Sequence, residues 1–335
     1  MSDFFYRAFE DRFRGSRSLI SARLVVYQPF LRPLAVAFQT PKALDLGCGR
    51  GEWLEVLSDS GFDAIGVDLN EGMLAACQER GLKGQLGDAL STLKGLPSES
   101  LALVSAFHLV EHLPFESAQN LVQEALRVLV PGGLLLLETP NSENLTVGTS
   151  SFYLDPSHLR PLPAALLEFV AEHAGFCRRK VIYLQEPADL HGDSQVGLMD
   201  VLSGVSPDYA LVAQKNAPPA LMAEFDAPFN AKYGLSLDTL ARRYDAQTSQ
   251  FNMELGEHSD QLEKAVVQMR QVQTHIEAQL SQVQTHIEAQ LSQVQTQLEA
   301  MLGSRSWRIT APMRWLGGAA RRVREWLVQF FKSTP

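Results

Sequence analysis

The chain has 335 residues, of which 45% are hydrophobic and 20% charged, and its formal net charge is −9. Such a composition can bury a core of ordinary size and excludes a wholly disordered chain. The three cysteines include no C-x-x-C pair, which excludes a disulfide framework and a cysteine-built zinc site and predicts a cytoplasmic location. No apolar run reaches the ~18 residues of a spanning helix, so we expect neither a secretory signal nor a membrane-spanning segment.

Five segments with different patterns follow one another along the chain. Residues 1–40 predict a helical cover, with arginines among aromatic residues. Residues 41–216 alternate short apolar runs with helical patterns, which predicts an α/β fold: a Rossmann-like, mainly parallel sheet with helices on both faces. A proline-flanked connector is expected over residues 217–244, a long coiled-coil helix over 245–303, and a basic amphipathic tail over 304–335.

Six apolar runs in the second segment predict strands of the sheet. A helix is expected over Glu116–Val130, and Pro131-Gly132-Gly133 should separate it from the strand that follows. The predicted strands are Ala43–Leu46, Ala64–Asp68, Leu101–Ala106, Leu134–Glu138, Val181–Leu184 and Ala210–Gln214.

A glycine-rich turn carries the strongest chemical signal. The first strand runs into G-C-G-R-G, with Gly47 and Gly49 allowing a ligand to approach the bare backbone before a helix begins. The G-x-G-x-G spacing departs from the G-x-G-x-x-G of dinucleotide-binding folds. Asp68 ends the next strand, where a carboxylate can accept hydrogen bonds from both ribose hydroxyls. Asp88 follows the expected third strand, where it can meet an adenine edge.

Together these residues resemble the class I S-adenosylmethionine-dependent methyltransferases over roughly residues 41–216. The resemblance implies S-adenosylmethionine as cofactor, with Leu69 and Met73 against the adenine and the segment Ala106–Leu113 facing the cofactor. The alternative for Asp45 and Asp68 is a turn-stabilising role. The cofactor-binding residues implied within this segment are Asp45, Gly47, Gly49, Gly51, Asp68, Leu69, Met73, Asp88, Ala89 and His108.

A closer resemblance concerns four motifs, Phe5–Glu10, Arg14–Arg17, Asp45–Leu54 and Tyr153–Pro161. They look like the methyltransferase part of O-antigen chain-terminating proteins of the WbdD type, which cap the non-reducing end of a lipopolysaccharide O-polysaccharide. The best-known members also carry a kinase domain, whereas no kinase motif is visible in this chain. The acceptor is therefore expected to be a sugar hydroxyl, or a phosphate that another protein has added.

The same resemblance implies a role for the N-terminal cover and for a loop near residue 158. Tyr6 and Arg23 occupy places where a covering helix contacts the cofactor, and a solvated helix face is the alternative for the arginine. A hydroxyl acceptor needs a general base, and histidine is the usual choice near neutral pH. We therefore expect His158 and then His112 to be catalytic, although a structural role is the alternative for each histidine. Substrate contacts are expected from Tyr153, His158 and Arg160.

An eleven-residue repeat marks the long helix. V-Q-T-H-I-E-A-Q-L-S-Q occurs at 272–282 and again at 283–293, and a degenerate copy follows at 294–304. Eleven residues make three turns of ~3.67 residues each, which favours a straight or slightly right-handed coiled coil. Valine, isoleucine and leucine form one apolar stripe between polar flanks, so we expect homo-oligomers rather than a helix folded back on its own domain. The stripe consists of Val272, Ile276, Leu280, Val283, Ile287, Leu291, Val294 and Leu298.

The C-terminal tail combines basic and aromatic residues. Residues 303–335 carry seven Arg or Lys and one acid, a charge of +6, so the rest of the chain carries −15. Trp326, Leu327 and Phe330 share one helical face, which is typical of a helix lying on a membrane surface. We expect a peripheral location at the cytoplasmic face of the inner membrane; docking on the chain itself or on a protein partner is the alternative. The acidic body argues against nucleic acid.

Three functions remain open from the sequence. The first is methylation of an O-polysaccharide end, with the polysaccharide as acceptor and a glycosyltransferase or polymerase as a partner. The second is a small-molecule or quinone O-methyltransferase that the coiled coil oligomerises. The third is a non-catalytic scaffold with a vestigial methyltransferase domain. No metal is expected.

Overall fold

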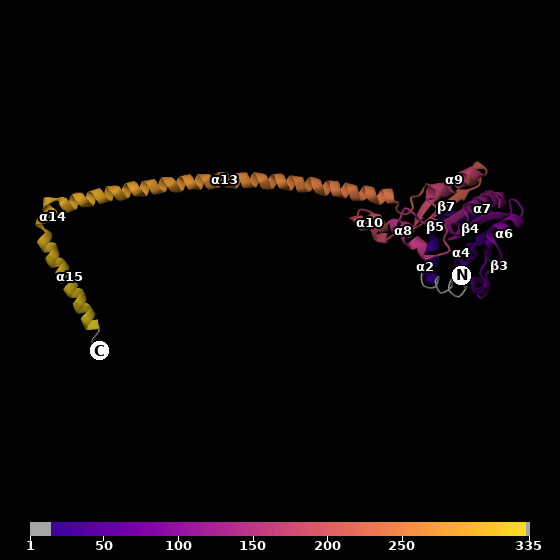
Figure 1. The fold of residues 1–335 in the computed structure, drawn as a ribbon, viewed down its shortest axis with the longest axis horizontal. Helices are drawn as coiled ribbons and strands as arrows, with labels where there is room; N and C mark the ends of the chain where they lie inside the picture. Colours follow the sequence, from indigo (N-terminus) through magenta and orange to yellow (C-terminus); the bar gives the residue numbers. More distant parts are fainter. Residues whose placement is uncertain (1–14, 333–335) are drawn as a thin grey trace. The chain divides into compact units, whose positions relative to one another are not determined.

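The computed structural model describes residues 15–332, so the expected cofactor residue Tyr6 lies outside the described residues. A first compact unit extends to Gln250, and a seven-stranded sheet in the order β3-β2-β1-β4-β5-β7-β6 lies at its centre (Figure 1). Strands β1 to β5 pair in parallel, while β7 runs antiparallel to both β5 and β6. The strands are β1 (Lys42–Leu46), β2 (Asp63–Asp68), β3 (Gly84–Leu86), β4 (Leu101–Phe107), β5 (Leu129–Pro140), β6 (Arg178–Leu184) and β7 (Asp208–Gln214). The predicted α/β fold and all six predicted strands are confirmed.

Short helices connect and cover these strands. They are α2 (Arg17–Leu24), η1 (Val25–Tyr27), α3 (Gln28–Ala37), α4 (Glu52–Asp59), α5 (Glu71–Gln78), α6 (Ala89–Gly95), η2 (Val110–His112), α7 (Phe115–Val128), α8 (Leu145–Thr149), η3 (Ser151–Leu154), α9 (Ala164–Ala174), η4 (Ala188–Leu190), α10 (Leu198–Ser203), α11 (Pro219–Ala223) and α12 (Asp226–Asn230).

The central strands are buried on both faces, which explains their continuous apolar runs. In β5, Leu135 and Leu137 belong to one core cluster with side chains of α6, α7 and α9. Leu134 and Leu136 point to the opposite face and belong to a second cluster with side chains of η1, α3 and α4. This alternation with a period of two residues divides the core into two layers, one on each side of the sheet.

The expected break at Pro131-Gly132-Gly133 is wrong. Helix α7 already ends at Val128, and β5 starts at Leu129 and continues through the three residues. Gly132 takes a positive φ of 82°, and the pairing of β4 with β5 shifts register at Leu101 and Leu103. Glycine allows this left-handed conformation. A local irregularity in the pairing of β5 with β4 therefore lies where the sequence predicted a turn between a helix and a strand.

The segment 217–244, expected to be a connector, takes part in the core. Phe225 and Phe229 are buried against the helices of the N-terminal cover. The long helix α13 begins at Leu237, eight residues before the expected start, and ends at Gly303. Its first turns belong to the first compact unit, because Leu240 is fully buried and Arg243 donates hydrogen bonds to two backbone carbonyls, those of Leu190 and Ser194.

The second compact unit comprises residues 251 onward and is helical as far as it is described. It contains most of α13, then α14 (Arg305–Ile309) and α15 (Ala311–Lys332). All eight side chains of the apolar stripe are exposed, from 49% to 63%. Among residues 15–332, no helix has both the length and the apolar character that crossing a bilayer requires.

Candidate functional site

The glycine-rich turn after β1 takes the conformation that its sequence predicts. Gly47, Gly49 and Gly51 all have positive φ, and the backbone amides of Gly47 and Cys48 donate to the carbonyl oxygen of Val67 in the neighbouring strand. A Cβ at Gly51 would lie 2.8 Å from the sulfur of Cys77, so this glycine is required by packing. Gly51 does not line either of the two cavities described below, whereas Gly47 lines both.

A first cavity opens at the carboxyl ends of β1, β2 and β4. It contains eight of the expected cofactor residues and also the expected catalytic residue His112. Asp68 ends β2, where its carboxylate accepts hydrogen bonds from the amides of Gly49 (2.9 Å) and Asn70 (2.8 Å). This carboxylate therefore fixes the glycine turn and also faces the cavity. The expected residues that line it are Gly47, Gly49, Asp68, Leu69, Met73, Asp88, Ala89 and His108.

Asp88 has a second role in this wall, because it caps helix α6. Its carboxylate accepts a hydrogen bond of 2.8 Å from the amide of Ser91. Hydrogen bonds from Ser91 lower the pKa of Asp88, so the group is an anion at neutral pH. Met73 is buried on the same wall while Leu69 is exposed, and the cavity thus combines two carboxylates with apolar side chains.

A second cavity adjoins the first, and its lining includes several charged side chains. Gly47, Phe107 and His108 line both cavities. Asp45 is buried in the second cavity's wall and accepts a hydrogen bond of 2.7 Å from Ser105, which also accepts one from the indole of Trp53. The remaining lining residues include Ile20, Arg23, Leu24, Cys48, Glu52, Glu138 and Gln185.

His108 lies where the two cavities meet, at the end of β4. Its φ of 53° is a left-handed conformation that non-glycine residues rarely adopt. Its imidazole nitrogens lie 3.4 Å from Glu111 and 3.5 Å from Glu138. Burial opposes protonation of His108, but the carboxylates of Glu111 and Glu138 outweigh it and hold the pKa of His108 well above its usual range.

Glu138 is a candidate site residue that the sequence did not predict. It is buried at the end of β5, accepts a hydrogen bond from the hydroxyl of Tyr27, and lies 3.3 Å from the amide of Gln185. Burial and the adjacent Glu138 raise the pKa of Tyr27 well above its usual value, so its hydroxyl stays protonated. The available signal was an acid that ends a run of four leucines at the same sheet edge as Asp45 and Asp68.

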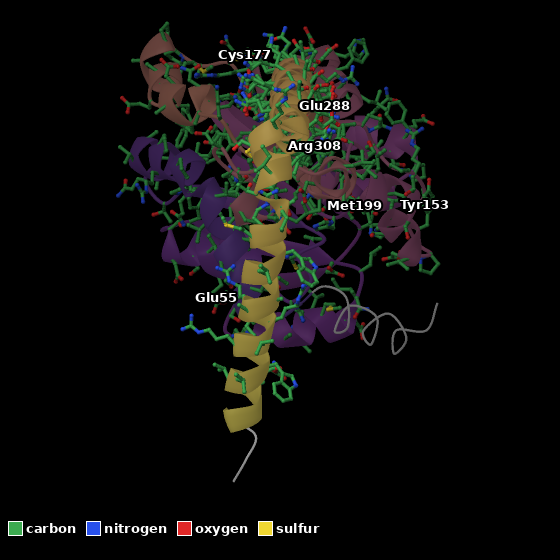
Figure 2. All side chains as sticks on the ribbon, turned by 90° about the vertical axis from the view of Figure 1, so that its left-hand side faces the viewer. Glu55, Tyr153, Cys177, Met199, Glu288 and Arg308 are labelled. Carbon is green, nitrogen blue, oxygen red and sulfur yellow. The ribbon has the colours of Figure 1, made fainter. Side chains whose placement is uncertain are left out.

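The residues expected to contact the acceptor lie apart from the cavities. Tyr153 is 61% exposed (Figure 2), and the guanidinium of Arg160 lies 4.3 Å above the ring of Phe115. His158 packs against Phe152 and against His112, with ring centroids 4.5 and 4.6 Å away. None of Tyr153, His158 and Arg160 lines either cavity, whereas His112 and Arg23 do.

The residues present fit S-adenosylmethionine. Bare glycine backbone borders the space between Asp68, Asp88 and the apolar wall of the first cavity, which suits a nucleoside. The second cavity adds the anionic side chains Asp45 and Glu138 and, at its rim, the cationic Arg23, which suits a sulfonium carrying an amino acid. Within the described residues, the expected cofactor residues other than Gly51 thus come together around the two cavities.

Comparison with known proteins gives consistent results. Residues 44–137 match a family described as "Methyltransferase domain". A probable S-adenosylmethionine-dependent methyltransferase of Mycolicibacterium smegmatis is 35% identical over 133 residues, 40% of this chain and 51% of the relative. A ubiquinone biosynthesis O-methyltransferase of Psychrobacter arcticus is 29% identical over 161 residues, 43% of this chain and 62% of the relative. The chain thus spans about half the length of the curated relatives it matches.

One solved structure supports the family most directly. A S-adenosylmethionine-dependent methyltransferase from Archaeoglobus fulgidus is 32% identical and superimposes with a TM-score of 0.56, over 63% of this chain and 100% of that chain.

Proposed function

This chain belongs to the class I S-adenosylmethionine-dependent methyltransferases, and we propose that it methylates the terminal sugar of a lipopolysaccharide O-polysaccharide and so ends chain growth. The observation that carries the choice of acceptor is the group of polar side chains that lines the second cavity together with His108. A sugar presents several hydroxyls, which need hydrogen-bonding partners once they leave water. Arg23, Glu138 and Gln185 can provide such partners in the second cavity.

The cofactor would be held by the residues of both cavities. Asp68 and Asp88 would bind the nucleoside in the first, and Asp45 and Arg23 would face the methionine part in the second. When bound, S-adenosylmethionine supplies a methyl group that an acceptor oxygen can take by in-line displacement. The main task of the chain is then to place that oxygen in line.

The pair of His108 and Glu138 is our candidate for handling the acceptor proton. His108 lines both cavities and Glu138 lines the second, with 3.5 Å between the His108 nitrogen and the Glu138 oxygen. Tyr27 and Gln185 hold Glu138 in place. Because His108 already carries its proton, the carboxylate of Glu138 is the member of the pair that would accept the hydroxyl proton. A phosphate acceptor would need no base, and Arg23 would then bind its charge.

The other parts of the chain support an acceptor at a membrane. The exposed stripe of α13 supports homo-oligomers through a coiled coil, and the charge of +6 in the tail supports contact with the inner-membrane surface. The motifs at residues 5–10, 14–17, 45–54 and 153–161 support the chain-terminator resemblance. In this proposal α13 is a spacer between catalytic unit and membrane, and a glycosyltransferase or polymerase is a partner.

A second candidate function is O-methylation of a quinone precursor or another small molecule. It is favoured by the names of several relatives, which are ubiquinone biosynthesis O-methyltransferases. A long apolar tail on such an acceptor would need an apolar sleeve, whereas the second cavity sets the charged side chains of Arg23, Asp45 and Glu138 among its apolar ones. The polysaccharide is therefore our first choice.

Transfer of a labelled methyl group distinguishes these functions. The full chain is incubated with methyl-labelled S-adenosylmethionine and, separately, with O-polysaccharide, with O-polysaccharide phosphorylated at its end, and with a catechol precursor of a quinone. We expect label on the terminal sugar or its phosphate. Label on the catechol alone would support the second candidate, and label on no acceptor, with the cofactor bound, would support a scaffold.

A further inference from the structure

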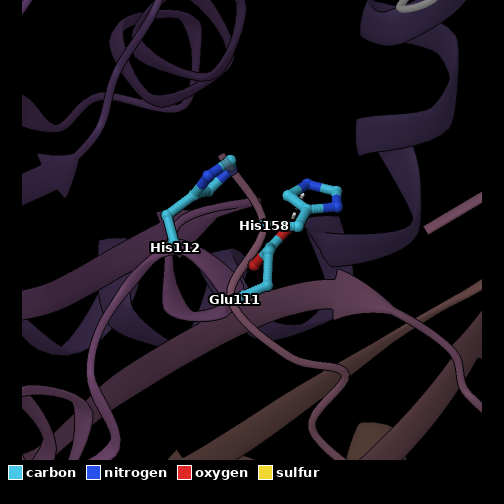
Figure 3. Close-up of side chains that lie close together, drawn as sticks. All are labelled: Glu111, His112 and His158. Carbon is cyan, nitrogen blue, oxygen red and sulfur yellow. Dashed lines mark ion pairs between the residues drawn. The ribbon is translucent and has the colours of Figure 1, made fainter. Parts of the chain in front are cut away.

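Three side chains next to the first cavity form a compact cluster that the proposed function does not use. Glu111 and His112 belong to η2, directly after β4, and His158 comes from the loop that follows η3 (Figure 3). One potential ligand atom of each residue lies within 4.8 Å of those of the other two. The helical turn η2 and a loop far from it in the sequence thus bring two imidazoles and a carboxylate together.

The carboxylate of Glu111 is fully buried, and only one of its oxygens has a hydrogen bond. Oε2 accepts a bond of 2.9 Å from the hydroxyl of Thr139. Within the described part of the chain, Oε1 accepts none, although His108 Nδ1 lies 3.4 Å away and His158 Nε2 4.0 Å away. A buried carboxylate oxygen without a hydrogen bond is costly, so this atom is suited to an additional ligand.

The hydrogen bonds of His158 leave one nitrogen directed at this oxygen. Its Nδ1 lies 2.6 Å from the carbonyl oxygen of Phe152, and because a carbonyl only accepts, Nδ1 must carry a proton. In the neutral ring the lone pair is therefore on Nε2, the atom that faces Glu111.

The same argument applies to His112 through a serine. The hydroxyl of Ser157 donates its single proton to Asp155 over 2.6 Å. The hydroxyl oxygen must then accept a hydrogen bond from Nδ1 of His112, 3.0 Å away, so Nδ1 carries the proton. In the neutral ring the lone pair of His112 is therefore on Nε2. Histidines that bind metal ions typically donate a hydrogen bond from one ring nitrogen to a carbonyl or a similar acceptor. The other ring nitrogen is then available to the metal.

We propose that Glu111, His112 and His158 bind a divalent transition-metal ion, with Oε1 of Glu111 and Nε2 of His158 among its ligand atoms. Two imidazoles and one carboxylate suit zinc and its neighbours rather than magnesium or calcium, which prefer oxygen ligands. Bonds of ~2.0–2.1 Å place tetrahedral ligand atoms ~3.3 Å apart. The present 4.0 Å between Glu111 and His158 must shorten by less than about 1 Å.

Such an ion would tie the loop of His158 to the turn that carries His112. Because His112 lines the first cavity, the ion would stiffen that part of the cavity wall. Three protein ligands also leave a coordination position open to solvent or to a ligand in the cavity. The site does not depend on which acceptor the protein methylates.

Metal binding by the full chain tests this proposal without any methyl transfer. Protein treated with a chelator and dialysed is titrated with Zn²⁺ by calorimetry and with Co²⁺ by visible absorption. We expect one strong site per chain and the intense d–d bands of a four- or five-coordinate ion. Glu111→Gln and His158→Asn should each weaken Zn²⁺ binding by more than ~100-fold, and Ser157→Ala, which frees His112, by about 10-fold.

Control variants separate this site from surface histidines. His173 stacks on Phe169 away from the cluster, and His275 and His286 are exposed on α13. His173→Asn and the double variant His275→Asn/His286→Asn should keep full affinity. Circular dichroism checks folding, and if Glu111→Gln does not fold, His158→Asn decides. Equal Zn²⁺ affinity of wild type and His158→Asn, or loss of binding in a control variant, would overturn the proposal.

Discussion

The hydroxyl of Tyr27 donates a hydrogen bond to the carboxylate of Glu138, across 111 residues of sequence. Tyr27 is fully buried at the end of η1, and its ring makes edge contacts with Trp53 and Phe107. The bond connects the N-terminal cover to the strand end that borders the second cavity. The cover is therefore part of the site's architecture, and we expect the hydroxyl of Tyr27 to influence activity through Glu138.

Replacing this phenol tests the coupling. Tyr27→Phe should lower kcat about 10-fold with little change in cofactor affinity, because Glu138 loses a bond that orients it. The cost to the free energy of unfolding should be about 1–2 kcal/mol. Tyr209→Phe is the matched control, since that buried hydroxyl donates to the carbonyl of Leu162. It should cost similar stability and leave kcat unchanged; equal kcat losses in the two variants would contradict the coupling.

We expect a substitution of Glu138 to lower methyl transfer more than the substitution of its hydrogen-bond partner Tyr27 does. Glu138→Gln keeps the shape and removes the charge, so we expect methyl transfer to fall by about 10²-fold or more while S-adenosylmethionine still binds. Glu143→Gln, which alters a carboxylate bonded to Tyr183, serves as the comparison and should retain activity. Single-turnover rates and calorimetry measure the two effects. Full activity of Glu138→Gln would remove this residue from the mechanism.

Asp208 predicts a pH-dependent stability. Burial and the adjacent Glu138 raise its pKa to about 6, although His108 opposes the shift. The pKa of Asp208 is higher in the folded than in the unfolded state, so the contribution of this group to the free energy of unfolding is largest at low pH. That contribution is lost as the pH rises from about 4 to 6. Asp208→Asn should therefore raise Tm more at pH 7.5 than at pH 4.5. The exposed Asp193→Asn is the control, and a gain independent of pH would contradict the assignment.

The apolar stripe of α13 predicts self-association. Ile276 and Ile287 are 49% and 53% exposed, so their burial requires another chain. Ile276→Asp/Ile287→Asp should shift the oligomer to monomer in sedimentation velocity, because charges on the stripe oppose packing. Glu277→Ala/Glu288→Ala, one position further along the helix, should leave the oligomer intact. A wild-type chain that sediments as a monomer at micromolar concentration would rule out the stripe as an interface.

The sequence predicted the sheet better than the acceptor side of the site. Continuous apolar runs locate buried parallel strands, and Asp68 and Asp88 follow strand ends, so their convergence could be expected from topology. Glu138 and Tyr27 meet only through tertiary packing, which no local pattern reveals. His158 was predicted to contact the acceptor because of its loop, but the loop turns its ring towards Phe152 and Glu111. The continuation of β5 through Gly132 was not predicted either, because the conformation of this glycine depends on the neighbouring strand.

Calorimetric titration of the full chain with S-adenosylmethionine tests the central claim most directly, with two variants of the same strand. Asp68 faces the first cavity, whereas Asp63 starts β2 and pairs with Lys83. We predict one cofactor per chain, a Kd raised about 10–100-fold by Asp68→Asn, and an unchanged Kd for Asp63→Asn. Absence of binding to the wild-type chain, or equal effects of the two substitutions, would contradict the account.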